Sequence, residues 1–391
     1  MHQAVLKYPY PYKAWLTLAN DPDNTTFEDW KELHSFIWEE LNLPFGDSLF
    51  VRSFNQNLPD QVSLESHPEI GEAHHHDIIH TWGDYMHARK RGFDREDAEE
   101  AAKTLKEIGI EPRVWIDHAS FVGNMIHGTD KGAKDKLIDS SGHVYQNFVY
   151  TLDIARELGI RYIWNGEVTD IVGQDRKLAF TDHKVQSGGS NLKASAKSVL
   201  QQVPGIRTGY VAPDNQQYYK RKFPDDSELY CFRRFGTWQD ADIDGLHNLI
   251  NPKKVDELMR KGGTAIVYSH IGKRHPEGAS RKNHIPDTTR ADLQNLKDRF
   301  EAKELMLSDV SGMLDYLVLR DNITIDTKGA TIQFNADGIR FQSLSTDDLK
   351  GMRFSFRTKQ LGTNKPTVLV NGDATSVDII AHNDQSFTIQ F

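Results

Sequence analysis

The sequence predicts an α/β protein, either a β/α barrel or an open doubly wound sheet, followed by a small all-β domain. Strand-like apolar segments alternate with helical segments over roughly 300 residues. Polar residues gather directly after several of these strands, where α/β folds keep their ligands. After Arg320 the pattern changes to short alternating segments separated by turns such as Asp-Thr-Lys-Gly and Asn-Gly-Asp. We therefore expect an α/β domain over residues 1–320 and a sandwich-like β domain over residues 321–391.

The composition limits the class of protein. The 391 residues include 47 basic and 56 acidic side chains, a net charge of −9, which argues against a general nucleic-acid binder. A single cysteine, Cys231, excludes an intrachain disulfide and suits a reducing compartment. No segment approaches the roughly 20 apolar residues of a membrane span, and the first residues do not resemble a signal peptide. We expect a cytoplasmic protein without a membrane span, whose oligomeric state the sequence does not indicate.

Individual elements follow from local patterns. Short apolar runs predict seven strands, at residues 13–20, 47–54, 77–82, 112–118, 160–165, 228–234 and 263–270. Helical spacing predicts helices at residues 26–42, 95–108, 144–158 and 286–319. Thr26 should cap the first of these helices, and Gly109 and Gly159 should close the next two. Residues 170–205 have no clear period and are expected to form an insertion or long loop.

The stretch from Glu72 to Tyr85, EAHHHDIIHTWGDY, is the richest in possible metal ligands. As a strand, it delivers His80 and Asp84 to the carboxyl end, where imidazole and carboxylate could bind a divalent ion together. The alternative is a polar turn of solvated histidines. Other strand ends also carry polar groups, and in a barrel all of them would share one rim. These groups are Asp21, Asp23, Asp117, His118, Arg233, Arg234 and His270.

In this arrangement the sequence resembles the polysaccharide deacetylase superfamily, carbohydrate esterase family four. That family begins with a strand followed by two acidic residues, for which LTLANDPD offers Asp21 and Asp23. Its second motif is His, Ser or Thr, two residues, and His; the counterpart here is HTWGD, from His80 to Asp84. The strand IVYSH ends at His270, where the family has a catalytic histidine. The resemblance covers residues 13–318 and implies a deacetylase-type barrel of about seven strands.

The resemblance also implies an activity. The chain would be a metal-dependent hydrolase that deacylates an N- or O-acylated carbohydrate in surface-glycan metabolism. Asp23, His80 and Asp84 would bind a divalent metal ion, either zinc or, because an aspartate replaces a histidine, a harder ion such as manganese. Asp21 would act as the base and His270 as the acid.

Further side chains near the strand ends could contact the carbohydrate substrate. The candidates are Arg113, Trp115, Asp117, His118, Trp164, Arg233 and Trp238. Tryptophans stack on sugar rings but are equally common in cores. Arg233 and Arg234 could hold a carboxylate or phosphate on an acidic sugar, although a structural ion pair is the commoner role. The alternative to an enzyme is a non-catalytic carbohydrate-binding or scaffold protein on a deacetylase barrel that has lost its activity.

Overall fold

The structure is a computed structural model of the chain. The residues it describes are 5–55, 57–73, 76–84, 93–116, 137–138, 144–145, 149–178, 182, 215–223, 225–237, 240–326, 331–334, 349–357, 366–382 and 386–391.

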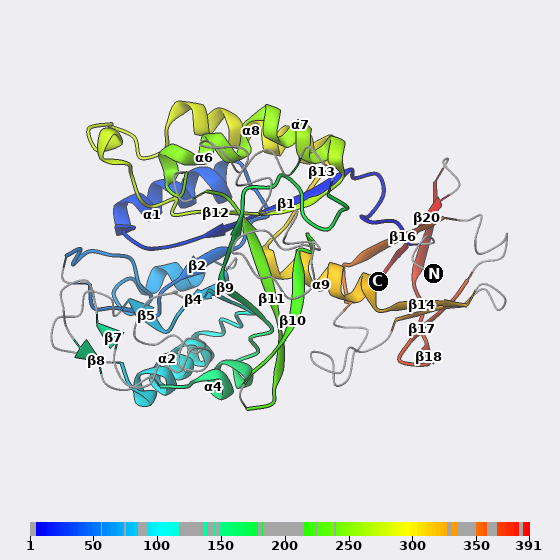
Figure 1. Cartoon of the computed structure of the whole chain (residues 1–391), viewed down its shortest axis with the longest axis horizontal. Coiled ribbons are helices and arrows are strands. Elements are labelled where there is room, and N and C mark those ends of the chain that lie inside the picture. The colour runs from blue at the N-terminus through cyan, green and yellow to red at the C-terminus, as the bar shows by residue number, and fades with distance from the viewer. Residues whose placement is uncertain are drawn as a thin grey trace, which may run out of the picture.

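An open, curved sheet forms the centre of the molecule and confirms the predicted α/β class (Figure 1). Its main path holds eight strands in the order β13–β1–β12–β11–β9–β6–β4–β2, all paired in parallel, and β10 adds antiparallel to β11. The bounds are β1 (Ala14–Asn20), β2 (Asp47–Leu49), β4 (His76–His80), β6 (Val114–Ile116), β9 (Tyr162–Thr169), β10 (Tyr218–Lys222), β11 (Glu228–Phe235), β12 (Thr264–Ser269) and β13 (Leu305–Leu307). Because the eight strands run in parallel, their carboxyl ends meet at one edge of this half-barrel.

Helices cover the convex face of the sheet in two groups (Figure 1). Over β1 and β12 lie α1 (Phe27–His34), which continues as a π-helix (Ser35–Glu40), α6 (Ile243–Ile250), α7 (Pro252–Lys261) and α8 (Asp287–Glu301). Over β4, β6 and β9 lie α2 (Arg95–Ile108) and α4 (Leu152–Glu157). The concave face instead receives α9 (Val310–Asp321), whose Met313 and Leu317 pack with Trp15 and Ile78 of the sheet. The concave face is therefore filled by α9 at the amino ends of the strands, which leaves the carboxyl ends for a site.

Local signals account for the elements that were predicted correctly. The Thr26 side chain caps α1 by accepting a hydrogen bond from the Asp29 backbone. The α2 helix has the predicted bounds, and it ends at Gly109, whose φ of 75° lies in the left-handed region that glycine tolerates. Asp94 begins α2 with a capping box. These signals depend on neighbouring residues alone, so they are readable from the sequence.

Two helix predictions are wrong in part. The segment predicted as a helix at 144–158 contains β8 (Val144–Tyr145), paired with β7 (Leu137–Ile138), and its helix starts only at Leu152. The segment at 286–319 is two helices, α8 and α9, separated by β13. Leu305–Leu307 has good helix-forming residues, but pairing with β1 makes it a strand.

The predicted strand at 47–54 is divided into β2 and β3 (Arg52–Ser53), and β3 pairs with β5 (Gly83–Asp84). The expected insertion at 170–205 lies largely outside the described residues.

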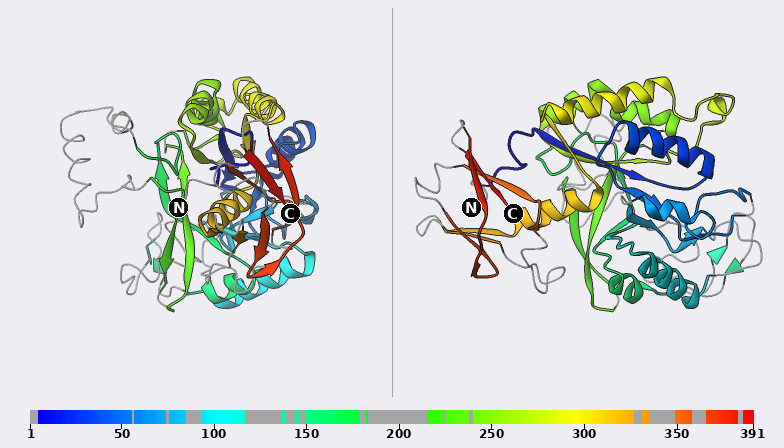
Figure 2. Two further views of the ribbon diagram at one scale, coloured as in Figure 1. Left: turned by 90° about the vertical axis from the view of Figure 1, so that its right-hand side faces the viewer. Right: turned by 180° about the vertical axis from the view of Figure 1, so that it is seen from behind.

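The C-terminal segment consists of short strands, as the alternation indicated. One sheet contains β14 (Ile323–Asp326), β15 (Thr331–Phe334), β17 (Thr367–Val370) and β18 (Asp373–Ala374). The other contains β16 (Arg353–Arg357), β19 (Asp378–Ala381) and β20 (Ser386–Gln390). Figure 2 shows α9 leading from the half-barrel to these strands, and the N-terminal Val5 pairs with Phe356 of β16. Apolar residues of both sheets belong to the same hydrophobic cluster as α9 and the concave face. A separate C-terminal domain therefore remains a prediction.

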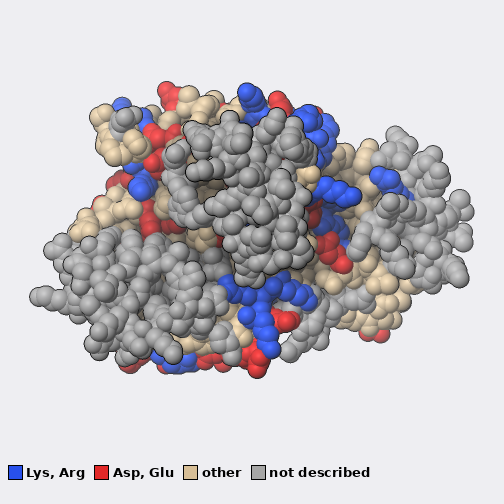
Figure 3. Space-filling model, in the orientation of Figure 1, with Lys and Arg blue, Asp and Glu red and all other residues tan. Residues whose placement is uncertain are grey.

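Two features of the described residues concern the charge and the apolar character inferred from the composition. On the described part of the face in Figure 3, basic and acidic side chains are interspersed. Among the described residues, no helix has both the length and the apolar character needed to cross a membrane.

Candidate functional site

The carboxyl edge of the sheet brings together residues from strands far apart in sequence. Asp21 follows β1, His80 ends β4 and His270 follows β12. Ala19 of β1 lies opposite Tyr268 of β12, and both belong to the cluster on the concave face. Because side chains alternate along a strand, Asp21 and His270, two residues further on, return to that same face. Parallel pairing therefore places these groups together.

The described side chains lie close enough to act as one group. The Nε2 atom of His80 is 3.0 Å from Oδ1 of Asp21, and Nε2 of His270 is 3.4 Å from Oδ2 of the same carboxylate. Asp21, Asp23 and His270 each offer one possible ligand atom, and these atoms lie within 4.8 Å of one another. Asp21, Asp23 and His80 are buried, and His270 is partly buried. Two carboxylate oxygens and an imidazole nitrogen form a donor set that suits zinc or manganese.

The ring of His270 is held in one orientation. Its Nδ1 atom donates a hydrogen bond to the carbonyl oxygen of Ala241, which can only accept. A neutral His270 therefore carries its proton on Nδ1 and presents the lone pair of Nε2 to Asp21. The hydroxyl of Tyr268 lies 3.2 Å from the same Nε2 atom. Such fixing of the far ring nitrogen is how proteins orient histidine ligands.

The backbone turns sharply directly after His80. Thr81 has a φ of 55°, which is rare for a β-branched residue and costs conformational energy. Its Oγ1 atom donates a hydrogen bond of 2.9 Å to the carbonyl oxygen of Gly83. The next side chain, Trp82, then leaves the concave face and packs under the convex-face helices, where its Nε1 donates to Thr151. The strained turn at Thr81 thus ends β4 at His80, beside the site.

Arg234 of β11 is a buried positive charge near the carboxylates of Asp21 and Asp23. Its Cζ atom lies 3.2 Å from the ring centroid of Trp164 and 3.8 Å from that of Tyr268. Burial lowers the pKa of Arg234 to about 10, while Tyr268, Asp21 and Asp23 act in the opposite direction. Arg234 therefore stays protonated at neutral pH. The sequence singled out the pair Arg233 and Arg234 but did not show which of them faces the site.

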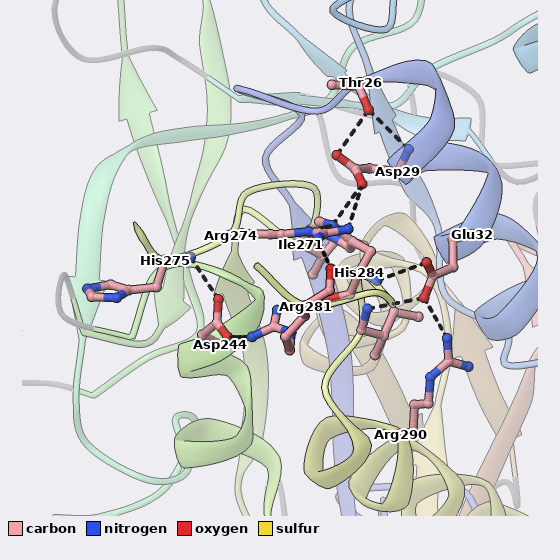
Figure 4. A network of polar contacts seen from close by, with 11 residues as sticks. Thr26, Asp29, Glu32, Asp244, Ile271, Arg274, His275, Arg281, His284 and Arg290 are labelled. Carbon is pink, nitrogen blue, oxygen red and sulfur yellow. Dashed lines mark hydrogen bonds and ion pairs between the residues drawn. The ribbon is translucent and has the colours of Figure 1, made fainter. Parts of the chain in front are cut away.

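The loop that follows His270, residues 271–286, is anchored to α1 (Figure 4). Asp29 lies 3.0 Å from Nδ1 of His284 and 3.3 Å from Nη2 of Arg274. The Nε2 atom of His284 donates to the carbonyl oxygen of Ile271. Burial alone would raise the pKa of Asp29, but the hydrogen bond and the charge of His284 lower it overall. This buried contact fixes the loop directly behind His270.

Glu32 anchors the same loop one helical turn further on (Figure 4). It accepts hydrogen bonds from the backbone nitrogens of His284, at 2.9 Å, and Ile285, at 3.2 Å. It also accepts one from Nη2 of Arg290 at 2.6 Å. Burial would raise the pKa of Glu32, but these backbone hydrogen bonds lower it overall. The α1 helix therefore positions the loop that follows β12 and the first turn of α8.

The predicted metal ligands are only partly brought together. Among the described residues, the group whose ligand atoms converge is Asp21, Asp23 and His270, which shares only Asp23 with the predicted set of Asp23, His80 and Asp84. Asp84 lies in β5, and its Oδ2 accepts a hydrogen bond of 2.8 Å from Nε2 of Gln61. Thr81, with its left-handed backbone, lies between His80 and Asp84 in the chain. His80 contacts Asp21 instead.

Several predicted substrate contacts lie elsewhere. Arg113 precedes β6 at the amino edge, opposite to the site, and pairs with Asp315 of α9 at 3.1 Å. Trp115 points to the convex side, where it packs against Trp82. Strand direction and the alternation of side chains account for these two positions. Asp117, His118 and Trp238 lie outside the described residues.

Trp164 and Arg233 have partners within the chain. The Trp164 ring is covered by Arg234, and its Nε1 donates to the carbonyl oxygen of Glu167. Arg233 forms an ion pair of 2.8 Å with the Glu167 carboxylate and lies over the ring of Tyr219. Trp164 thus belongs to the site as the support of Arg234, and Arg233 has the structural ion pair that the sequence left open.

Comparisons with known proteins add no family to this geometry. No family model matches the chain, and neither does any curated protein or solved structure.

Proposed function

We propose that the chain is a divalent-metal-dependent hydrolase of the polysaccharide deacetylase type, which removes acyl groups from N- or O-acylated carbohydrates of surface glycans. One observation carries the proposal: Asp21, Asp23 and His270 offer ligand atoms within 4.8 Å of one another at the carboxyl edge. Carbohydrate as the substrate class rests on the resemblance of the motifs at Asp21 and His80.

The roles of the side chains follow from their contacts. Asp21, Asp23 and His270 would hold the ion, which when bound polarises a carbonyl group and makes a water molecule more acidic. His80 lies 3.0 Å from Asp21, so this pair can accept a proton from water and return it to the leaving group. Burial of both residues excludes bulk water and strengthens these interactions. His80 thereby takes the proton-transfer role that was predicted for His270.

Metal content tests the proposal directly. Wild type loaded with zinc or manganese and then desalted should retain about one ion per chain. Asp23→Asn and His270→Ala should lose most of it because each removes a ligand. Asp84→Asn is the matched control, since it changes an acid of the same motif region outside the group and should retain the ion. The measurement is elemental mass spectrometry of the folded variants.

Turnover completes the test. Wild type should release acetate from at least one of a panel of N- and O-acetylated sugars, and His80→Gln should release far less while retaining the ion. Loss of metal from Asp84→Asn but not from His270→Ala would refute the assignment and restore the ligand set inferred from sequence. A wild type that binds neither metal would favour the non-catalytic carbohydrate-binding alternative.

A further inference from the structure

The two consecutive arginines of β11 have different environments. Arg233 pairs with Glu167 at 2.8 Å and donates a second hydrogen bond, of 2.6 Å, to the carbonyl oxygen of Gln216. Arg234 points to the other side of the strand and is fully buried beside Trp164 and Tyr268. All three guanidinium nitrogens of Arg234 are buried without a hydrogen-bond partner among the described residues. Among the described residues, the guanidinium of Arg233 thus has hydrogen-bond acceptors and that of Arg234 has none.

Two aromatic rings limit where a partner of Arg234 can lie. Trp164 and Tyr268 lie over the guanidinium with their ring centroids 3.2 Å and 3.8 Å from Cζ. These rings occupy two sides of the guanidinium, which leaves its N–H edge for a further group. That edge carries parallel N–H donors that match the two oxygens of a carboxylate or phosphate. The rings also fix the orientation of the donors before a ligand arrives.

Burial of Arg234 without hydrogen-bond acceptors is energetically unfavourable, and a bound ligand would account for it. A buried guanidinium without acceptors loses its hydration and gains no hydrogen bond in return. Buried polar groups that remain unsatisfied are rare in native proteins and commonly mark a place where a ligand or water completes the bonding. Asp21 and Asp23 lie near enough to favour the charged form of Arg234. Once these carboxylates bind a divalent ion, however, they no longer offset the positive charge of Arg234.

We propose that Arg234 binds an oxyanion of the ligand, so that the site accepts an acidic sugar carrying a carboxylate or phosphate. This proposal rests on the proposed function for the location of the reaction, but oxyanion binding itself is measurable without turnover. The oxyanion would occupy the N–H edge of Arg234, beside the group formed by Asp21, Asp23 and His270. Arg234 would then determine the charge of the substrate, while the acyl group reacts at the neighbouring group.

Calorimetric binding of three probes to the metal-loaded protein tests the proposal. D-glucuronate and inorganic phosphate should bind to wild type, and D-glucose, which lacks the charge, should bind at least about tenfold more weakly than glucuronate. Arg234→Gln should lose about tenfold or more in affinity for both anions. Arg233→Gln is the matched control because it removes the same charge from the next residue, and it should bind both anions like wild type.

A stability measurement separates binding from a structural role. Phosphate should raise the melting temperature of wild type and of Arg233→Gln but not that of Arg234→Gln or Arg234→Met. Without anion, Arg234→Met should melt at or above the wild-type temperature, because it removes a buried charge that lacks hydrogen bonds. If Arg234 only supports the fold, Arg234→Met melts well below wild type and anions bind all folded variants alike.

Three results would overturn the proposal. These are equal anion affinity in wild type and Arg234→Gln, equal binding of glucose and glucuronate, and the absence of anion binding to folded wild type. A different pattern is expected if only the proposed metal-dependent function is wrong. In that case wild type does not bind the metal, but its binding of anions still depends on Arg234.

Discussion

Phe354 connects the C-terminal strands to the half-barrel, so shortening its side chain should destabilise both. It is fully buried in β16, and its ring stacks on Tyr316 of α9 with centroids 4.9 Å apart. Tyr316 in turn contacts Trp15 of β1 with centroids 5.0 Å apart. These rings belong to one hydrophobic cluster that extends from the concave face to the C-terminal strands. A cavity made beside Phe354 should therefore affect the half-barrel as well.

The expected loss is large compared with the stability of a typical protein. Replacing Phe354 by alanine should cost about 3–5 kcal/mol, the usual range for a buried phenylalanine. At about 2.1 cal/mol/K per residue, unfolding of 391 residues has an entropy of about 0.8 kcal/mol/K. The melting temperature should therefore fall by about 4–6 °C if the chain unfolds as one unit.

Tryptophan fluorescence makes this test specific to the half-barrel. All seven tryptophans precede residue 320, so their signal does not report the C-terminal strands directly. Ile380→Ala is the matched control, because Ile380 of β19 is 44% exposed and its loss should change stability by less than about 0.5 kcal/mol. If the tryptophan-detected melting temperature of Phe354→Ala equals that of wild type, the two parts unfold independently and the argument from a shared core is wrong.

The remaining predictions concern pH and the coupling of ligands. Burial raises the pKa of Asp77 well above its ordinary value, so the folded chain keeps a proton that the unfolded chain releases near pH ~4, and stability falls as the pH rises. Asp77→Asn should flatten this fall in urea midpoints between about pH 5 and pH 8, and an unchanged slope would contradict the reasoning. Glu32→Ala should lower the free energy of unfolding by about 1–3 kcal/mol at neutral pH, because two backbone N–H groups lose their acceptor. Since hydrogen bonds lower the pKa of Glu32, the deficit should shrink as the pH falls below 4.5, and a constant deficit in acid urea titrations would argue against it. Bound zinc or manganese should tighten the binding of glucuronate severalfold in calorimetry, and equal affinities with and without metal would exclude coupling.

The parts of the fold that sequence predicts are those decided by neighbouring residues. Apolar runs locate β1, β4, β9, β11 and β12 to within a few residues, and Gly109 locates the end of α2. The β13 strand could not be found in this way, because only its pairing with β1 distinguishes it from the helices on either side. The β10 strand was also not predicted, and it too is identified by its pairing, which is antiparallel to β11, the next strand in the chain.

The histidine-rich stretch shows why the candidate site was only partly predictable. His76 and His80 stand at opposite ends of β4, about 13 Å apart at roughly 3.3 Å per residue, and cannot share one ion. The Nε2 atom of His76 donates to the carbonyl oxygen of Ile70, whereas His80 contacts Asp21. Asp77, between them, accepts a hydrogen bond from the backbone of Ser311 at the start of α9. A strand that crosses the whole sheet therefore divides its polar residues between the two edges.

The sequence also did not show which face of the sheet each side chain occupies. Arg233 and Arg234 were predicted to have the same role, yet adjacent residues of a strand point to opposite faces. Register and the curvature of the sheet decide that Arg234 faces the site and Arg233 faces Glu167. A tryptophan that appeared suited to sugar stacking, Trp115, was placed on the convex side by the same rule.

The charges at the carboxyl edge would favour the binding of a cation and an anion together. Asp21 and Asp23 supply two negative charges and Arg234 one positive charge, which leaves a net negative charge while the histidines are neutral. A divalent ion held by the carboxylates reverses that sign, and an oxyanion at Arg234 then restores neutrality. Each uncompensated charge is costly in a buried site, so the cation should bind before the anion. A neutral acyl sugar would leave Arg234 uncompensated at the moment when the metal is in place, and that difference in electrostatic energy would let the site distinguish acidic from neutral sugars.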